Sequence, residues 1–263
     1  MVSILLFFVF LFGLAIGSFL NVLIYRLPHD LPILGRSFCP RCKKKIAWQD
    51  NIPLLSFAIL GGKCRHCRFP ISLQYPVVEL TTAVLFVLTA FYITQTRIMN
   101  YESGIMDFVT LGYNLFIVSA LIAIFFTDLK SGIIPNKIIY PSVLLSTVYL
   151  LIIHNSLFII HLLSAFGAFA FFLLLFLVTR GRGMGFGDLK LAFLMGLFLG
   201  FPKIVIALYI AFLTGAVVSL ILVLWGKKKF FGGTIPFGPF LVLGTLVSLF
   251  FGEGLLRLFL LLL

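Results

Sequence analysis

The stretch Gly183-Met184-Gly185-Phe186-Gly187-Asp188-Leu189-Lys190 places one carboxylate directly after three alternating glycines. Apolar segments flank it on both sides. A carboxylate this close to hydrocarbon is costly, so it usually has a function. Asp128 occurs in the same tripeptide, Asp-Leu-Lys, and also adjoins an apolar run. We therefore expect Asp128 and Asp188 to form a pair at one membrane surface that activates water.

The composition is that of a membrane protein with many spans. Apolar residues make up 62% of the chain and charged residues only 11%, whereas soluble domains are about a quarter charged. Apolar runs long enough to cross about 30 Å of hydrocarbon recur along the whole length. We predict an all-α polytopic membrane protein with about eight transmembrane helices.

The positive charges indicate the membrane topology. The net charge is +12, and 17 of the 20 Lys and Arg residues lie in alternate loops: nine in 26–75, two in 128–137, three in 180–190 and three in 227–229. Cytoplasmic loops carry such an excess. The pattern favours a role in topology over binding of nucleic acid. It places the N-terminus outside, and Asp128 and Asp188 at the cytoplasmic face.

The long hydrophilic stretch, residues 26–75, contains all four cysteines. They form two C-x2-C pairs with 21 residues between them, Cys39 with Cys42 and Cys64 with Cys67. This separation is close to that of zinc ribbons. Disulfides and free thiols are the alternatives, and a reducing cytoplasm disfavours disulfides. We predict a small cytoplasmic zinc-ribbon-like loop domain with a structural zinc ion.

Polar residues also occur within the first two apolar segments. Gly17, Ser18 and Asn21 share one face of the first segment, where small residues favour helix packing. Asn21 could instead line a polar cavity. Glu79 lies one turn into the second segment and is either a functional acid or an ion-paired interfacial residue.

Three later segments are ambiguous. The apolar segment 189–200 is too short to span a bilayer, so it is tilted, extended through Pro202 or re-entrant. Residues 232–239 are rich in Gly and Pro, which indicates a simple loop or backbone packed near the catalytic floor. The tail 255–263 could continue the last segment after a break at Gly252–Gly254.

Two carboxylates that share one water cannot both ionise readily, so the pair holds one proton. The charged member takes a proton from water, and the protonated member polarises the scissile carbonyl. Gly185 and Gly187 lack Cβ atoms and would let an extended peptide approach; a turn with positive φ is the alternative for Gly187. The competing interpretation is two separate acids, paired with Lys130 and Lys190.

Five motifs follow one another in a fixed order along the chain. They are Gly17-Ser18-Phe19-Leu20-Asn21-Val22 with Arg26-Leu27-Pro28, the two C-x2-C pairs, Tyr75-Pro76-Val77-Val78-Glu79-Leu80, Asp128 before Ile134-Pro135-Asn136, and Gly185-Phe186-Gly187-Asp188. Together they resemble the bacterial type IV prepilin peptidases, which also process type II secretion pseudopilins.

The resemblance implies an eight-helix aspartic peptidase of the bacterial inner membrane. It would remove the short basic leader of prepilins or pseudopilins at the cytoplasmic face, cutting after a glycine, with Asp128 and Asp188 as the catalytic pair and the four cysteines as zinc ligands. Its parts would be a first transmembrane helix (1–25), a cytoplasmic zinc-binding loop domain (26–75) and a membrane-embedded peptidase domain (76–263).

Many members of that family also N-methylate the new terminus with S-adenosylmethionine. This activity is associated with the N-terminal half, where Glu79, Asn21 and Arg26 are the candidate residues. The resemblance therefore favours an enzyme with both activities. A peptidase without methyltransferase activity and an ion-coupled transporter that uses the two aspartates are the alternatives.

Overall fold

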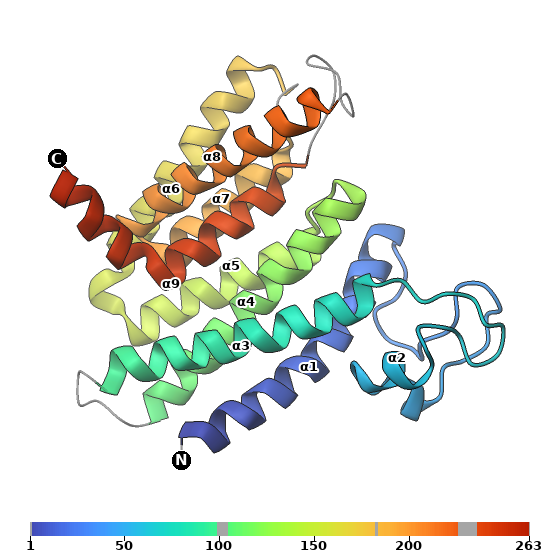
Figure 1. The fold of residues 1–263 in the computed structure, drawn as a ribbon. Helices are drawn as coiled ribbons and strands as arrows, with labels where there is room; N and C mark the ends of the chain where they lie inside the picture. The colour runs from blue at the N-terminus through green and yellow to red at the C-terminus, as the bar shows by residue number, and fades with distance from the viewer. Residues whose placement is uncertain (1, 99–104, 182–183, 226–235, 263) are drawn as a thin grey trace. The chain divides into compact units, whose positions relative to one another are not determined.

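The computed structural model describes residues 2–98, 105–181, 184–225 and 236–262, and its long segments are helical (Figure 1). The helices are α1 (Val2–Arg26), α2 (Leu55–Ile59), α3 (Gln74–Ile98), α4 (Ile105–Ser131), α5 (Asn136–Ile153), α6 (Asn155–Val178), α7 (Phe186–Leu199), α8 (Lys203–Leu224) and α9 (Gly238–Leu262). Within these residues only isolated β-bridges occur, and no strand. The all-α prediction is confirmed.

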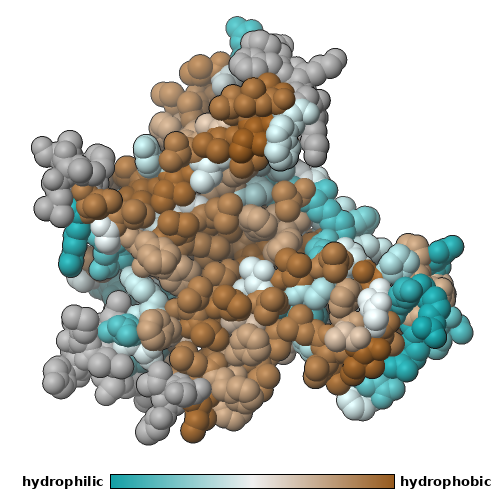
Figure 2. All heavy atoms as spheres, in the orientation of Figure 1, coloured by the Kyte–Doolittle hydropathy of each residue, from teal (hydrophilic) through white to brown (hydrophobic). Residues whose placement is uncertain are grey.

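Seven helices in the described part of the chain are long and apolar enough to cross a membrane: α1, α3, α4, α5, α6, α8 and α9. The remaining apolar segment, α7, has 14 residues and is about 21 Å long. Hydrophobic side chains cover the visible face of the helices, and hydrophilic ones gather over the segment that contains α2 (Figure 2). The chain is a multi-pass membrane protein.

The chain divides into two compact units, Met1–Ala123 (unit 1) and Ile124–Leu263 (unit 2). In unit 1, α1 packs along α3. A Cβ atom added at Gly13 or Gly17 would lie 2.6 Å from the Cα atom of Ala83 or Glu79, respectively. Glycine therefore allows the two backbones to approach closely, in agreement with the packing face predicted around Gly17.

In unit 2, α7 is the central helix. It contacts α5, α6, α8 and α9, and the side chains of Leu189, Leu191 and Leu194 are fully buried. A Cβ atom at Gly196 would overlap the backbone of Ala165 on α6. Surrounding protein therefore covers this short helix, and its C-terminal end lies near the start of α6, where Nδ1 of His161 is 2.7 Å from the carbonyl oxygen of Leu197.

Helices α8 and α9 pack against each other along unit 2. The Nζ atom of Lys203 at the start of α8 lies 2.9 Å from Oε1 of Glu253 near the end of α9. The helix α9 continues through Gly252 and Gly254, so the break considered at these glycines does not occur. Gly252 instead lies against α8, because an added Cβ atom would lie 3.3 Å from Cγ of Lys203.

Candidate functional site: a buried aspartate pair and a four-cysteine centre

Asp188 lies in the first turn of α7, and the backbone before it determines its position. Gly185 precedes the helix with an extended conformation (φ −83°, ψ 153°) and donates its N–H to Oδ2 of Asp188 over 3.0 Å. Only 6% of Asp188 is exposed. An acid in the first turn also interacts favourably with the positive end of the helix dipole. The local sequence therefore provides a buried site that accepts a carboxylate.

Asp188 lies outside the seven candidate spans. Burial raises the pKa of its carboxyl group to about 6; the N–H of Gly185 opposes this shift, and the nearby charge of Asp128 adds to it. The two carboxyl groups are thus close enough to interact electrostatically. Such a pair titrates as one system that can hold a single proton near neutral pH.

Asp128 lies near the C-terminal end of α4 and is 4% exposed. Its Oδ2 atom is buried and has no hydrogen-bond partner among the described residues, and the same is true of Oγ1 of the adjacent Thr127. Buried polar atoms are normally paired, so an unpaired carboxylate oxygen needs an explanation. Contact with water or substrate would supply one.

The sequence singled out the stretches that contain Gly238 and Ile134 but gave neither residue a role beside the pair. A Cβ atom at Gly238, the first residue of α9, would lie 2.5 Å from Oδ2 of Asp128 and 3.3 Å from Cδ1 of Ile134. A Cβ atom at Gly187 would lie 3.1 Å from Cβ of Ile134. Ile134 therefore contacts the backbone beside both aspartates. Gly238 belongs to the Gly- and Pro-rich stretch 232–239, and its position supports the alternative that this backbone packs near the aspartate pair and does not form a simple loop. Residues 232–235 lie outside the described residues.

The turn with positive φ considered for Gly187 is wrong. Gly187 lies within the first turn of α7 and is absent from the positions with positive φ. Its lack of a side chain matters instead because Ile134 lies against it. Gly185 differs, since an added Cβ atom would meet nothing closer than Oδ2 of Asp188, at 3.6 Å.

The lysine that follows Asp188 has its own partners. The Nζ atom of Lys190 donates to Oδ1 of Asn136 over 2.8 Å, which links α7 to α5. It also lies 5.4 Å and 5.0 Å from the ring centroids of Tyr140 and Phe186. These contacts place Lys190 in a helix-anchoring role, so the structure favours a coupled pair of aspartates over an Asp188–Lys190 pair.

The four cysteines in unit 1 come together. The Sγ atoms of Cys39, Cys42, Cys64 and Cys67 all lie within 4.8 Å of one another, and none of these residues forms a disulfide. The Sγ atoms of Cys39 and Cys67 are 3.8 Å apart. Zn–S bonds of about 2.3 Å in a tetrahedron give a sulfur–sulfur separation of about 3.8 Å. The donor set therefore fits one zinc ion, with all four positions filled by protein.

The two C-x2-C segments have the same backbone geometry. In the first, the N–H of Lys43 donates to the carbonyl of Cys39 over 2.9 Å; in the second, the N–H of Arg68 donates to that of Cys64 over 3.0 Å. Lys43 and Arg68 both have positive φ. Backbone N–H groups of Cys67 and His66 lower the pKa of the Cys64 thiol to about 6. The N–H of Phe69 lowers the pKa of the Cys67 thiol, but burial and hydrogen bonds with the neighbouring thiols outweigh it and raise this pKa to about 11, so the thiols titrate as a group.

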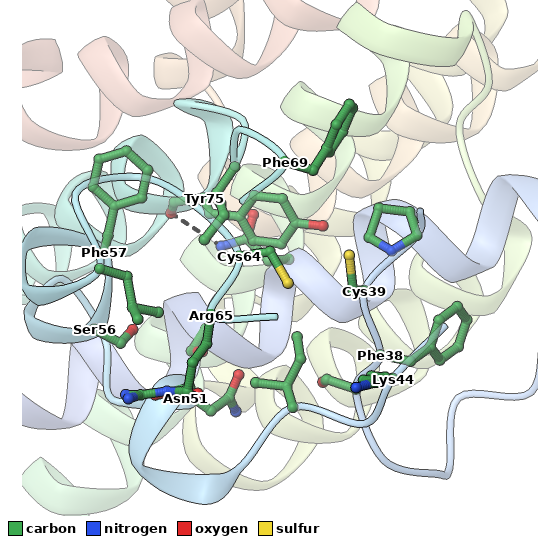
Figure 3. Close-up of a pocket in the computed structure, with 18 of the residues that line it drawn as sticks. Phe38, Cys39, Lys44, Asn51, Ser56, Phe57, Cys64, Arg65, Phe69 and Tyr75 are labelled. Carbon is green, nitrogen blue, oxygen red and sulfur yellow. Dashed lines mark hydrogen bonds and ion pairs between the residues drawn. The ribbon is translucent and has the colours of Figure 1, made fainter. Parts of the chain in front are cut away.

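The candidate residues of the N-terminal half line one pocket of about 190 Å³ in unit 1. Asn21 and Arg26 on α1 and Glu79 on α3 contribute to it, together with the Cys39 and Cys64 regions of the loop. Figure 3 shows Phe57, Phe69 and Tyr75 around the same space. The structure thus brings together the three residues that the sequence suggested for methyl transfer.

Arg26, however, has a specific structural task. Its guanidinium group donates to the carbonyls of Pro32, Ile33, Gly35 and Arg36 over 2.8–3.2 Å. Four of its five N–H groups can be used in this way. Arg26 therefore holds the beginning of the loop against the end of α1, and sequence analysis did not foresee this role.

Comparisons with known proteins follow the same division of the chain. The Bacterial Peptidase A24 N-terminal domain matches residues 11–93, and the Type IV leader peptidase family matches residues 115–220. A prepilin leader peptidase/N-methyltransferase of Legionella pneumophila is 34% identical, covering 94% of this chain and 91% of its own. Those of Aeromonas salmonicida (strain A449) and Pseudomonas aeruginosa are 33% and 31% identical, each over 95% of this chain and 91% of their own. No solved structure matches.

The fold and the two sites define a polytopic helical membrane protein with a buried aspartate pair and a four-cysteine centre. The chain belongs to the type IV leader peptidase family. The resemblance drawn from the sequence motifs is confirmed.

We predict that the purified protein contains about one zinc ion per chain, because four thiolates close a tetrahedral site. Cys39→Ser and Cys64→Ser should each lower the metal content and the resistance of the loop to protease. His66→Asn is the matched control and should keep the ion, since His66 is not among the four converging ligands. Metal analysis of the four proteins checks this; a stable, metal-free wild-type loop would contradict it.

Proposed function

We propose that this chain removes the leader peptide of type IV prepilins or type II secretion pseudopilins and then N-methylates the new amino terminus. The observation that carries the peptidase part is the buried, electrostatically coupled pair Asp128 and Asp188, with an unpaired oxygen on Asp128. The curated relatives that cover most of the chain are named for both activities. Their names favour the two-activity enzyme over a peptidase alone and over a transporter.

The two aspartates divide the work of amide hydrolysis. The N–H of Gly185 and the N-terminal end of α7 stabilise negative charge on Asp188, whereas burial favours its protonated form, so the two aspartates share one proton. The ionised member of the pair takes a proton from the attacking water. The shared proton on the other carboxyl group polarises the scissile carbonyl and is then available to the leaving amine.

Gly185 and Gly187 are the proposed substrate-proximal residues. In the free protein there is room for a Cβ atom at Gly185. The lack of a side chain there is therefore useful only when another molecule, such as the substrate, approaches. At Gly187 that space is already taken by Ile134. The substrate role therefore has better support at Gly185, and Gly187 serves packing beside the pair.

The proposed membrane placement follows the charge distribution. The N-terminus is outside, the loop domain 26–75 is in the cytoplasm, and the peptidase domain 76–263 presents both aspartates at the cytoplasmic face of the inner membrane. An apolar substrate helix can then lie in the bilayer while its scissile bond remains at the interface.

The implied cofactors have separate tasks. The four cysteines would hold zinc in a closed site, which supports the loop and takes no part in hydrolysis. S-adenosylmethionine supplies a methyl group when bound. The pocket of unit 1 has acceptors and aromatic walls that fit part of such a molecule. Its volume of about 190 Å³ is below the roughly 300–1,000 Å³ of whole-ligand pockets, so it fits one end only.

We predict that Asp128→Asn and Asp188→Asn each lower leader cleavage by at least about a hundredfold, the lower range for loss of an acid–base group. Asn keeps the side-chain size and can still accept the N–H of Gly185, so both variants should fold. Mass spectrometry of a co-expressed prepilin measures leader length and methylation together. Cleavage near the wild-type rate by either variant would exclude the pair mechanism.

We predict that Gly185→Ala keeps the thermal stability of the wild type but cleaves prepilin about ten to a hundred times more slowly, because displacement of the peptide by about 1 Å can cost a hundredfold. The φ of −83° suits alanine. Gly167→Ala is the matched control, since an added Cβ atom there meets nothing within 4 Å. An unchanged cleavage rate for Gly185→Ala would remove Gly185 from the substrate path.

We predict that Gly238→Ala impairs cleavage about as strongly as loss of Asp128, because the added Cβ atom would displace that carboxyl group. Gly254→Ala in the same helix is the control, since its Cβ atom would lie in open space. Methylation of a supplied peptide that already has the mature terminus should remain normal in both variants. Rapid cleavage by Gly238→Ala would show that this contact is unimportant for the reaction.

A further inference from the structure

The amide of Asn21 is oriented by two backbone carbonyls and leaves one acceptor unused. Its Nδ2 atom donates to the carbonyls of Gly17 and Tyr75 over 3.3 Å and 3.1 Å. Rotating the amide would place an oxygen against both carbonyls, so the assignment of Oδ1 is determined by its neighbours. Oδ1 is buried and has no partner among the described residues, and Asn21 is only 3% exposed.

Glu79 brings a carboxylate to the same pocket. Gly17 lies one turn before Asn21 on α1 and packs against the backbone of Glu79 on α3. The side chains of Asn21 and Glu79 therefore line the pocket from neighbouring turns where α1 crosses α3. Oε2 of Glu79 accepts the N–H of Leu54 over 2.8 Å. Only 7% of the surface of Glu79 is exposed.

Five basic residues line the pocket, and among the described residues none is found in an ion pair with Glu79: Arg26, Lys44, Lys45, Arg65 and His66. Arg26 donates to the loop carbonyls described above, and Arg65 pairs with Asp50 through two nitrogens. What the pocket offers at this crossing is therefore an unused amide oxygen and a carboxylate whose partners are the N–H of Leu54 and the hydroxyl group of Ser18. Aromatic rings, among them Phe57 and Tyr75, form the walls (Figure 3). Oxygen acceptors and ring faces both favour a cation that has N–H donors.

We propose that Oδ1 of Asn21 and the carboxylate of Glu79 form a binding site for a primary ammonium group. The inference rests on the proposed function, which names two molecules that carry such a group. One is the peptide whose amino terminus is freed by leader cleavage, and the other is the methyl donor, through its methionine amino group. The limited size of the pocket suits the end of either molecule.

The test uses the purified full-length protein with its zinc and two pairs of probes. The first pair is a peptide that begins with phenylalanine, with a free or an acetylated amino terminus. The second is S-adenosylhomocysteine and its analogue without the amino group. Calorimetric titration should show that the wild type binds the free-amino form of at least one pair at least tenfold more tightly than the blocked form. The pair that shows this preference identifies the source of the ammonium group.

Three variants separate recognition from folding. Glu79→Gln keeps the shape and the acceptor for Leu54, and Asn21→Leu removes the free oxygen at similar volume. Asn114→Leu is the matched control, because Asn114 makes the same hydrogen bond to the carbonyl four residues earlier and lies outside the pocket. Glu79→Gln and Asn21→Leu should abolish the preference for the amino group and leave binding of the blocked probes unchanged. Asn114→Leu should behave as the wild type.

The ammonium site is excluded if the wild type binds free-amino and blocked probes equally well. It is also excluded if the preference for the free amino group persists in both Glu79→Gln and Asn21→Leu. The same preparations are assayed for cleavage and methylation of a prepilin by mass spectrometry. If the wild type cleaves and methylates but shows no preference for the amino group, the ammonium site fails and the proposed function stands. If it neither cleaves nor methylates, the proposed function fails as well.

Discussion

The position of the Asp188 carboxylate depends on α7, a short helix that other helices cover. With 14 residues, α7 is packed against α5, α6, α8 and α9, and its far end lies beside His161 of α6. Its first turn then presents unpaired N–H groups and the positive end of the helix dipole to the acid. The N–H of Gly185 completes this environment. A longer, lipid-facing helix would offer no such buried end.

The surroundings of Asp128 show how closely the backbone approaches the pair. Gly238 begins α9 directly against the carboxyl group, and Ile134 fills the space between Gly238 and Gly187. Three segments that are distant in sequence thus limit where the carboxyl group of Asp128 can lie. The backbone N–H of Gly238 interacts with this carboxyl group, and its Oδ2 atom is buried without a well-formed hydrogen bond among the described residues.

In unit 1, a few polar contacts attach the hydrophilic loop to the helices. Arg26 binds four carbonyls after the end of α1, and Glu79 on α3 accepts the N–H of Leu54 in the loop. The two C-x2-C turns bring their sulfur atoms together at the distances that a zinc ion requires. These attachments form the pocket, because they hold the loop over the polar crossing of α1 and α3. Glu79 therefore lines the pocket and also holds the loop through the N–H of Leu54.

The sequence by itself determined the all-α membrane fold, the two aspartates as candidates and the four-cysteine centre. These features depend on hydrophobic runs, on the cost of isolated acids and on ligand spacing, which are local properties of the chain. The sequence also indicated that the apolar segment 189–200 is too short to span a bilayer comfortably. It could not show that Gly238 touches Asp128, that Arg26 is used by loop carbonyls, that Gly187 has a helical backbone beside Ile134, or that α9 continues through Gly252. Only the tertiary structure decided these points, because each depends on which distant segment lies next to a residue, and contacts between distant segments leave no periodic pattern in the sequence.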